Sequence, residues 1–170
     1  MFVNSFECEV NHCDQNAQFN SSESSTYQEL DQTISLVYGG GFLDGFEAQD
    51  SVWLHDIEVP EQTFALVTNE DRGSTINFSC LIGLSYPSLA PNGELLFFDN
   101  IINNNLLESN IFTSYYYIDG EHADLTFGYI DPIFYTGDIV WAPVQKQEHW
   151  NIPIDDIKID GMSLGFCENT

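Results

Sequence analysis

The sequence predicts an all-β fold with one or two short helices, and three observations support this class. First, short runs rich in β-branched and aromatic residues are typical of strands, and they occur at residues 34–38, 51–54, 62–67 and 139–142. Second, turn-forming residues separate these runs. Third, apolar residues at rough helical spacing are confined to residues 94–107, with a single turn expected at 24–27.

Cysteine and glycosylation signals occur both before and after the first strand run. Cys8 and Cys13 lie five positions apart in a polar stretch, a spacing suited to a small disulfide ring. Asn20 and Asn77 each open an Asn-x-Ser sequon for glycosylation. These marks favour a secreted protein, in which cysteines are usually paired. Cys80 and Cys167 are then left over; Cys80, within an apolar run, is expected as a small buried residue, with a reactive thiol as the alternative.

Three consecutive glycines follow the first strand run. Tyr38 ends that run, and Gly39, Gly40 and Gly41 come directly after it. Glycines at a hairpin tip let the backbone approach a ligand closely. The functional interpretation is a mobile lid over a cleft with Tyr38 directed inward, and the alternative is an ordinary hairpin turn.

Further turns divide the rest of the chain. Turn chemistry is found at Asp44-Gly45 and at residues 91–93, 119–120, 135–138 and 160–161. The turn near residues 118–123 follows an apolar strand and marks a boundary between residues 1–118 and 119–170. No internal repeat is visible.

The charge balance excludes two classes of partner. The chain holds 27 Asp and Glu against three Lys and Arg, which gives a formal net charge of −24. Nucleic-acid binding and docking on anionic membranes both need clustered basic residues, so neither partner is expected. A hydrophobic content of 43% nevertheless predicts a folded chain. No stretch approaches the roughly 20 apolar residues of a membrane span, and residues 1–7 lack the features of a signal peptide.

Sites for metals and cofactors are not expected. The four histidines, His12, His55, His122 and His149, are widely separated and lack ligand spacing. No nucleophile-elbow motif is present either. We therefore assign most of the acidic residues to the solvated surface.

A series of motifs in one order resembles the pepsin family of aspartic proteases. The stretch Phe78 to Ser88 is similar to the family's Phe-Asp-Gly-Ile-Leu-Gly-Leu-x-Tyr-Pro-Ser block, with Ser79-Cys80 in place of Asp-Gly. Tyr135 to Val144 resembles the family's Tyr-Thr-Gly-x-x-x-Trp-x-Pro-Val segment. The other similar segments are residues 2–5, 8–13, 19–27, 38–45, 98–100, 149–152, 159–161 and 167. The resemblance covers essentially the whole chain.

The resemblance implies a portion of a bilobal fold that cleaves peptide bonds with two aspartates, one in each lobe. Two close carboxylates cannot both ionise, an effect for which this family is a standard example. One carboxylate activates water and the other, protonated, polarises the scissile carbonyl. This chain contains neither Asp-Thr-Gly nor Asp-Ser-Gly. We expect both catalytic loops outside it, no catalytic residue within it, an inactive chain on its own, and a partner for Cys167 beyond Thr170.

The resemblance also suggests substrate-binding residues. It identifies Tyr38 as the flap tyrosine, Gly39 and Gly41 as flap glycines, and Leu81 as a pocket wall, with core packing as the alternative for Leu81. Gly40 stands where most members carry Thr or Ser. Phe2 stands where many carry a Trp whose indole N–H holds the flap tyrosine, and Phe has no such donor.

Two functions from different classes follow. The first is the middle segment of a pepsin-like endopeptidase, with residues 1–118 in the N-terminal lobe and residues 119–170 opening the C-terminal lobe. Its substrate would be a peptide or protein, its parent a monomer, and its location extracellular or in a lysosomal or vacuolar lumen. The second is a non-catalytic homologue that binds peptides or proteins. An acidic extracellular β domain with chance matches is the remaining alternative.

Overall fold

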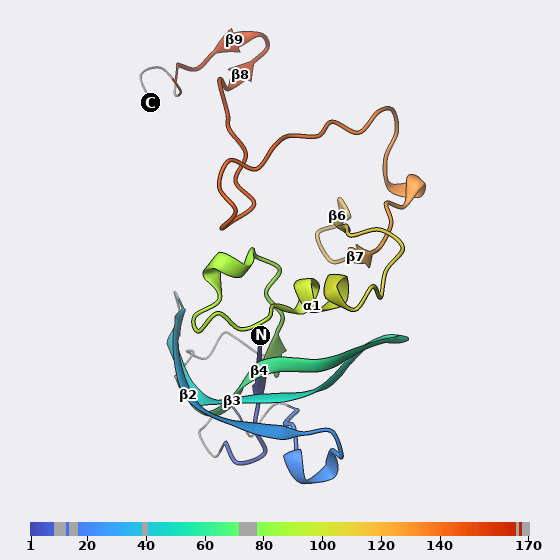
Figure 1. Ribbon diagram of the computed structural model, residues 1–170. Helices are drawn as coiled ribbons and strands as arrows, with labels where there is room; N and C mark the ends of the chain where they lie inside the picture. Colours follow the sequence, from blue (N-terminus) through green and yellow to red (C-terminus); the bar gives the residue numbers. More distant parts are fainter. Residues whose placement is uncertain (9–12, 14–16, 39–40, 72–77, 166, 168–170) are drawn as a thin grey trace.

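The computed structural model describes residues 1–8, 13, 17–38, 41–71, 78–165 and 167. A five-stranded sheet forms the body of the molecule, with the strand order β2-β3-β4-β1-β5 (Figure 1). Its strands are β1 (Phe2–Asn4), β2 (Gln28–Tyr38), β3 (Gly41–Leu54), β4 (Ile57–Asp71) and β5 (Cys80–Leu81). The all-β prediction is therefore confirmed.

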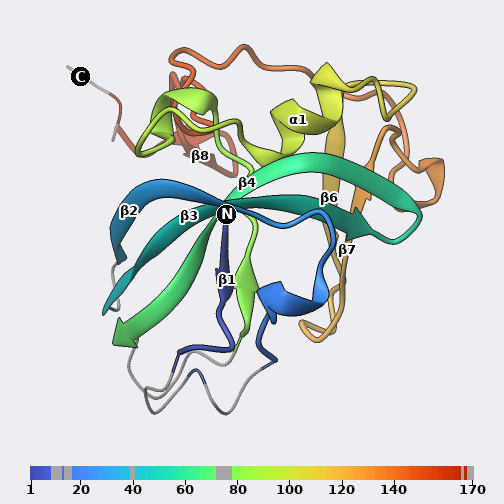
Figure 2. The same cartoon turned by 60° about the horizontal axis from the view of Figure 1, so that its bottom comes forward.

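The sheet is built on an antiparallel meander of long strands. β2 pairs with β3 and β3 pairs with β4, both antiparallel. The short strand β1 then pairs with β4 in parallel and with β5 antiparallel. Long β-branched and aromatic runs favour such strands, and Figure 2 shows that they curve together around the chain's start.

One short α-helix lies over the sheet. Helix α1 (Phe97–Asn103) buries Phe97, Asn100 and Ile101. The side-chain amide of Asn100 donates to the carbonyl oxygen of Pro60 at 2.9 Å and to Oε1 of Gln62 at 3.2 Å. These bonds attach the helix to β4 while satisfying buried polar groups. The helix expected within residues 94–107 is confirmed.

Three single 3₁₀ turns complete the helical structure: η1 (Ser21–Glu23), η2 (Pro87–Leu89) and η3 (Pro132–Phe134). The turn expected at residues 24–27 lies earlier, at η1. Asn20 caps η1, since its Oδ1 accepts from the backbone N–H of Ser22 at 3.2 Å. A side-chain acceptor at this position satisfies an orphan helix donor.

The hydrophobic core lies entirely in the first part of the chain. It comprises three clusters centred on Phe2, on Phe64 and on Phe97. No described residue after Ile101 is buried. Residues 1–107 therefore form the packed region of the molecule.

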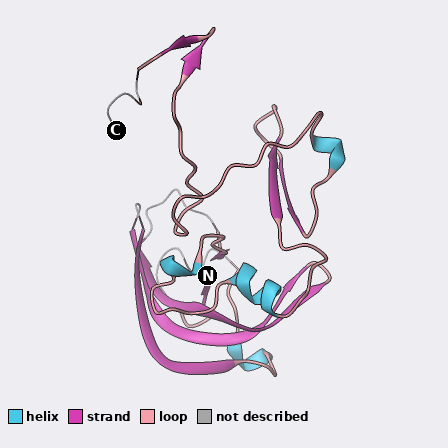
Figure 3. Cartoon of the chain, turned by 45° about the horizontal axis from the view of Figure 1, so that its top comes forward, coloured by secondary structure: helices cyan, strands magenta, loops and turns pink. Residues whose placement is uncertain are grey.

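The remainder of the chain is extended. It contains two small hairpins, made of β6 (Phe112–Tyr116) with β7 (Ala123–Phe127) and of β8 (Lys158–Ile159) with β9 (Met162–Ser163). Between and after them the chain runs mostly as loop (Figure 3). The strand expected at residues 139–142 is wrong: the structure has no regular element there, and Val140 and Trp141 are 90% and 73% exposed. Strand propensity alone does not form a strand where no neighbour supplies the ladder hydrogen bonds.

The turn expected at Asp44-Gly45 is also wrong. Both residues lie inside β3, at an irregularity in its pairing with β4. A Cβ at position 45 would lie 2.0 Å from the carbonyl oxygen of Leu66. Glycine is needed here because two backbones approach closely, not because the chain turns.

Of the described residues, none belongs to a helix that is both long and apolar enough to span a membrane.

Candidate functional site

The glycine-containing segment lies between β2, which ends at Tyr38, and β3, which begins at Gly41. β2 and β3 pair from Gln28 with Gln49 to Tyr38 with Gly41. The hairpin prediction is thus confirmed, while Gly39 and Gly40 lie outside the described residues. The backbone of Tyr38 ends β2 and that of Gly41 begins β3. The role of this hairpin as a lid stays a prediction.

The two strands of this hairpin pack on Phe2 in the half that lies nearer Tyr38 and Gly41. Phe2 is 1% exposed and forms a cluster with Ile34 of β2, Leu43 of β3, and Ala65 and Val67 of β4. Phe2 also approaches the ring of Phe78, with a centroid distance of 5.9 Å. Because a Phe side chain has no hydrogen-bond donor, the ring of Phe2 contributes by packing.

Leu81 joins the same cluster from the opposite side of β1. It pairs with Phe2 across the β1–β5 ladder and packs, partly buried, against the Phe2 cluster. The structure therefore brings Leu81 together with Ile34 and Leu43 of the β2–β3 hairpin, and the Leu81 side chain is half-buried.

Cys8, Cys13 and Cys80 form one disulfide pair and one exposed thiol, and Cys167 is half-buried. Cys8 and Cys13 form a disulfide and are both buried. The expectation that Cys80 is buried is wrong: it lies on β5 opposite Val3, and its thiol is exposed. β5 is at the edge of the sheet, so one side of this strand has no described neighbour to cover it.

Of the two sequon asparagines, Asn20 lies within the described residues and Asn77 does not. Asn20 is half-buried; its Nδ2 donates to Oε1 of Glu23 at 3.0 Å, and its Oδ1 accepts from the hydroxyl of Ser22 at 2.8 Å. Asn77 lies outside the described residues. Glycosylation at either position stays a prediction.

Two buried carboxylates lie on β3. Glu47 accepts from Nδ2 of Asn92 at 2.6 Å. Asp50 accepts from the hydroxyl of Thr26 and from the backbone N–H of Ser51 at 2.8 Å. Neutral donors hold both groups, as a buried carboxylate requires when cations are scarce. Sequence analysis assigned the acids to the surface and missed these two; because they lie three residues apart, strand alternation gives no signal for their burial.

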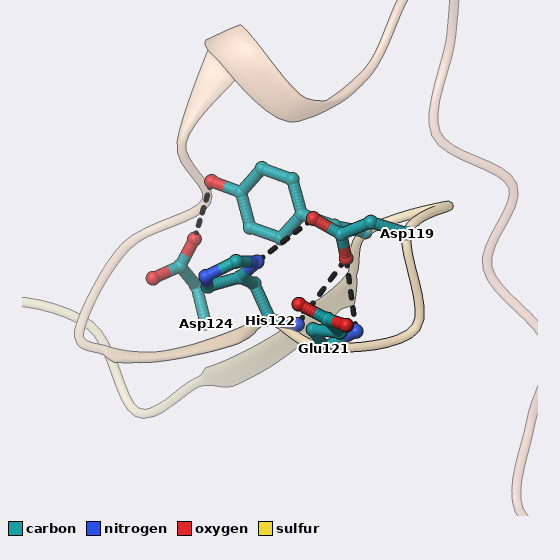
Figure 4. Close-up of polar contacts among 5 residues, drawn as sticks. Asp119, Glu121, His122 and Asp124 are labelled. Atoms are coloured by element: carbon teal, nitrogen blue, oxygen red, sulfur yellow. Dashed lines mark hydrogen bonds and ion pairs between the residues drawn. The ribbon is translucent and has the colours of Figure 1, made fainter.

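An exposed polar cluster occupies the turn between β6 and β7 (Figure 4). Nδ1 of His122 lies 2.8 Å from Oδ2 of Asp119, and Oδ1 of Asp119 accepts from the backbone N–H of Glu121 at 3.0 Å. The hydrogen bond with His122, followed by that from Glu121, lowers the pKa of the Asp119 carboxyl. The hydroxyl of Tyr117 donates to Asp124 at 2.7 Å, which raises the pKa of Tyr117. Sequence analysis predicted the turn but not this cluster.

Metal binding finds no support in the part of the chain that the structure describes. There, no group of three or more His, Cys, Asp or Glu side chains is placed to hold an ion.

A cavity of about 720 Å³ lies away from the predicted site residues. Its apolar wall is formed by α1, β6, η3 and the loops that follow, including Phe98, Phe112, Tyr115, Phe134, Trp141 and Trp150. Leu81 does not line it. The aromatic residues of this lining were visible in the sequence, but residues 139–142 were interpreted as a strand and residues 135–138 as a turn.

Comparison with known proteins agrees with the order of the motifs. The family model described as "Eukaryotic aspartyl protease" matches residues 1–170. Chymosin from Callithrix jacchus is 35% identical over 99% of this chain and 45% of its own length. Gastricsin from Macaca fuscata fuscata is 37% identical over 98% of this chain and 45% of its own length. Chymosin from Bos taurus is 35% identical over 98% of this chain and 44% of its own length.

The chain thus spans less than half the length of these curated relatives. The match nevertheless extends over every element described above. The chain belongs to the eukaryotic aspartyl protease family, the family of pepsin.

Proposed function

We propose that residues 1–170 are the middle segment of a pepsin-like aspartic endopeptidase. The single observation that carries this proposal is the family match over residues 1–170, in the same order as the motifs of the sequence. The hairpin of β2 and β3 over the Phe2 cluster agrees with it, since a lid and a pocket wall are the parts this segment would supply.

The site residues take the following roles in this proposal. Tyr38, Gly39, Gly40 and Gly41 form the flap that covers a bound peptide. Leu81 contributes an apolar wall to the pocket for the residue before the scissile bond. The catalytic carboxylates come from outside residues 1–170, which contain no Asp-Thr-Gly or Asp-Ser-Gly. The 170-residue chain alone is therefore inactive.

Peptide cleavage by the full-length protein tests the proposal. We expect cleavage of an apolar peptide at acid pH and tight binding of a statine-type mimic of the transition state, because such mimics use the interactions that accelerate the reaction. The 170-residue chain should do neither. Flanking coding sequence without either catalytic triplet would contradict the proposal.

A non-catalytic homologue that binds peptides or proteins is the second candidate. Three departures from the family pattern favour it: Gly40 lacks the usual side-chain donor, Phe2 lacks the indole N–H, and Ser79 replaces an aspartate. A full-length protein of this kind would bind a peptide while showing no preference for the statine mimic over its substrate-like analogue.

The remaining expectations are part of the same proposal. We assign residues 1–118 to the N-terminal lobe and residues 119–170 to the opening of the C-terminal lobe, a division that falls in the turn between β6 and β7. We also propose a monomeric full-length protein in an extracellular, lysosomal or vacuolar compartment. Near the reference pKa values of Asp and Glu, much of the charge of −24 would be neutralised there. Such a location would expose the Asn20 and Asn77 sequons to glycosylation.

A further inference from the structure

The loop at residues 145–151 contacts the segment that follows the proposed pocket wall. Nε1 of Trp150 donates to the carbonyl oxygen of Leu84 at 2.6 Å. The backbone N–H of Tyr86 donates to the carbonyl oxygen of Glu148 at 3.1 Å, and the hydroxyl of Ser88 donates to that of Gln147. Three hydrogen bonds therefore join two segments that are about sixty residues apart in the sequence.

Aromatic contacts reinforce these hydrogen bonds. The ring of Trp150 lies 4.5 Å from that of Tyr86 and 5.3 Å from that of Phe112, measured between centroids. Phe112 in turn lies 5.1 Å from Phe98 on α1. Aromatic pairs at such separations contribute beyond the apolar area they bury. Trp150 thus links the loop 84–88, hairpin β6–β7 and helix α1.

The loop that carries Trp150 has its own internal bonds. The backbone N–H of Glu148 donates to the carbonyl oxygen of Lys146 at 2.8 Å, and that of Asn151 donates to His149 at 2.8 Å. Nζ of Lys146 lies 2.5 Å from Oε1 of Glu148. A loop bonded within itself loses less conformational entropy when it contacts another segment.

In residues 81–88, the segment that begins with the proposed pocket wall, the first two residues are fixed by the sheet and its core. Leu81 is held by its pairing with Phe2, and Ile82 packs against the cluster around Phe97. Beyond Leu84 the segment leaves the sheet, and its described bonds to a distant part of the chain are those to residues 147–150. The first anchor comprises Leu81 and Ile82 and the second begins at Leu84, so Gly83 lies between them.

We propose that Trp150 is a positioning residue, which latches the loop 84–88 and thereby holds Leu81 in place as the pocket wall. This inference rests on the proposed function, which assigns Leu81 to the pocket. Small displacements of a supporting group are enough to weaken substrate binding. The interaction acts through Leu84, because Trp150 itself does not contact the proposed pocket.

Trp150→Phe in the full-length protein tests this inference, since it removes the N–H donor and keeps an aromatic ring. Trp53→Phe is the matched control, because Trp53 is 63% exposed on β3. We expect amide exchange in residues 84–88 to accelerate in Trp150→Phe alone. For peptides with a large apolar residue before the scissile bond, we expect KM to rise about five-fold with kcat changed less than about two-fold, as the loss of one hydrogen bond predicts.

Each outcome decides part of the inference. Unchanged exchange in residues 84–88 would overturn the latch. Faster exchange with unchanged KM would overturn the positioning role and leave Trp150 a structural contact. If the unmodified protein neither cleaves peptides nor binds the statine mimic, the proposed function fails and the positioning role with it, while the exchange measurement still decides the latch. Should Trp150→Phe fold poorly, Ser88→Ala removes a second latch bond and is expected to accelerate the same exchange.

Discussion

Residues 1–107 and residues 108–167 use similar amino acids to opposite effect. In the first region, Phe2, Phe64 and Phe97 are 1–3% exposed. In the second, Ile118, Val140 and Trp141 are 103%, 90% and 73% exposed. The difference lies in the layers: the first region packs a helix against a five-stranded sheet, whereas the second has two-stranded hairpins, of which β6–β7 meets α1 through ring contacts of Phe112 and Phe127 with Phe98. Apolar composition becomes a core only where a second layer covers it.

The largest test of this comparison is the behaviour of the 170-residue chain alone. We expect aggregation or a partly molten state, because exposed apolar surface and unpaired strand edges both favour association. Binding of a hydrophobic dye together with a weak near-UV circular dichroism signal would report it. A sharp, cooperative thermal transition would instead mean that the second region is stable as it stands.

Gly45→Ala should strongly affect the first region. The added Cβ would meet the backbone of Leu66 at 2.0 Å, and backbone atoms cannot rotate away as a side chain can. We expect the free energy of unfolding of the full-length protein to fall by about 3 kcal/mol or more. Gly83→Ala is the control, since a Cβ there meets nothing within 4 Å; equal effects of the two changes would refute the argument from close approach.

Gly45 also indicates how far the sequence alone could predict the fold. The strands, the glycine hairpin and helix α1 follow from local patterns, because their hydrophobic periodicity and turn residues agree with the tertiary structure. Asp44-Gly45 has the local signal of a turn, but its pairing with β4 places it inside a strand. Such a contact between distant residues has no signature in a single sequence.

Contacts between distant residues also explain the other differences between the sequence predictions and the structure. Residues 139–142 have strand composition but no described partner strand, and Cys80 lies in an apolar run but on a sheet edge. For the candidate site, the hairpin follows from its glycines, whereas Leu81 was located through the family resemblance. The cavity and the contacts of Trp150 depend on how segments far apart in sequence meet, so local patterns could not predict them.

Trp141→Ala tests whether the second region is covered in the full-length protein. Trp141 is 73% exposed here, so its truncation would change the free energy of unfolding by less than about 1 kcal/mol if it stays solvated. We expect a loss of about 2 kcal/mol or more, because the curated relatives are more than twice as long and the additional chain would bury this ring. Trp53→Ala, in the packed region, should remain below about 1 kcal/mol. Equal, small losses of unfolding free energy for Trp141→Ala and Trp53→Ala would contradict the burial of Trp141 in the full-length protein.

The smallest effect concerns the turn between β6 and β7, where the pKa of Asp119 is lowered by the hydrogen bond with His122. A carboxyl group whose pKa is lowered by folding stabilises the folded turn above its unfolded pKa of about 3.9. That contribution is lost as the pH falls through the lowered folded value. We therefore expect a nuclear magnetic resonance titration of the Asp119 carboxyl carbon to have its midpoint below about 3.9.

His122→Asn should move that midpoint upward, because it removes the largest cause of the lowering. A midpoint at or above the ordinary value in the unmodified chain would contradict the hydrogen bond. Since Asp119 and His122 are both exposed, and no described residue of their region is buried, loss of the pair should loosen the turn alone. Amide exchange within β3 and β4 should be the same in His122→Asn as in the unmodified chain at each pH, because their hydrogen bonds and core do not involve this turn. Accelerated exchange in both regions at once would mean that the two are energetically coupled despite their different packing.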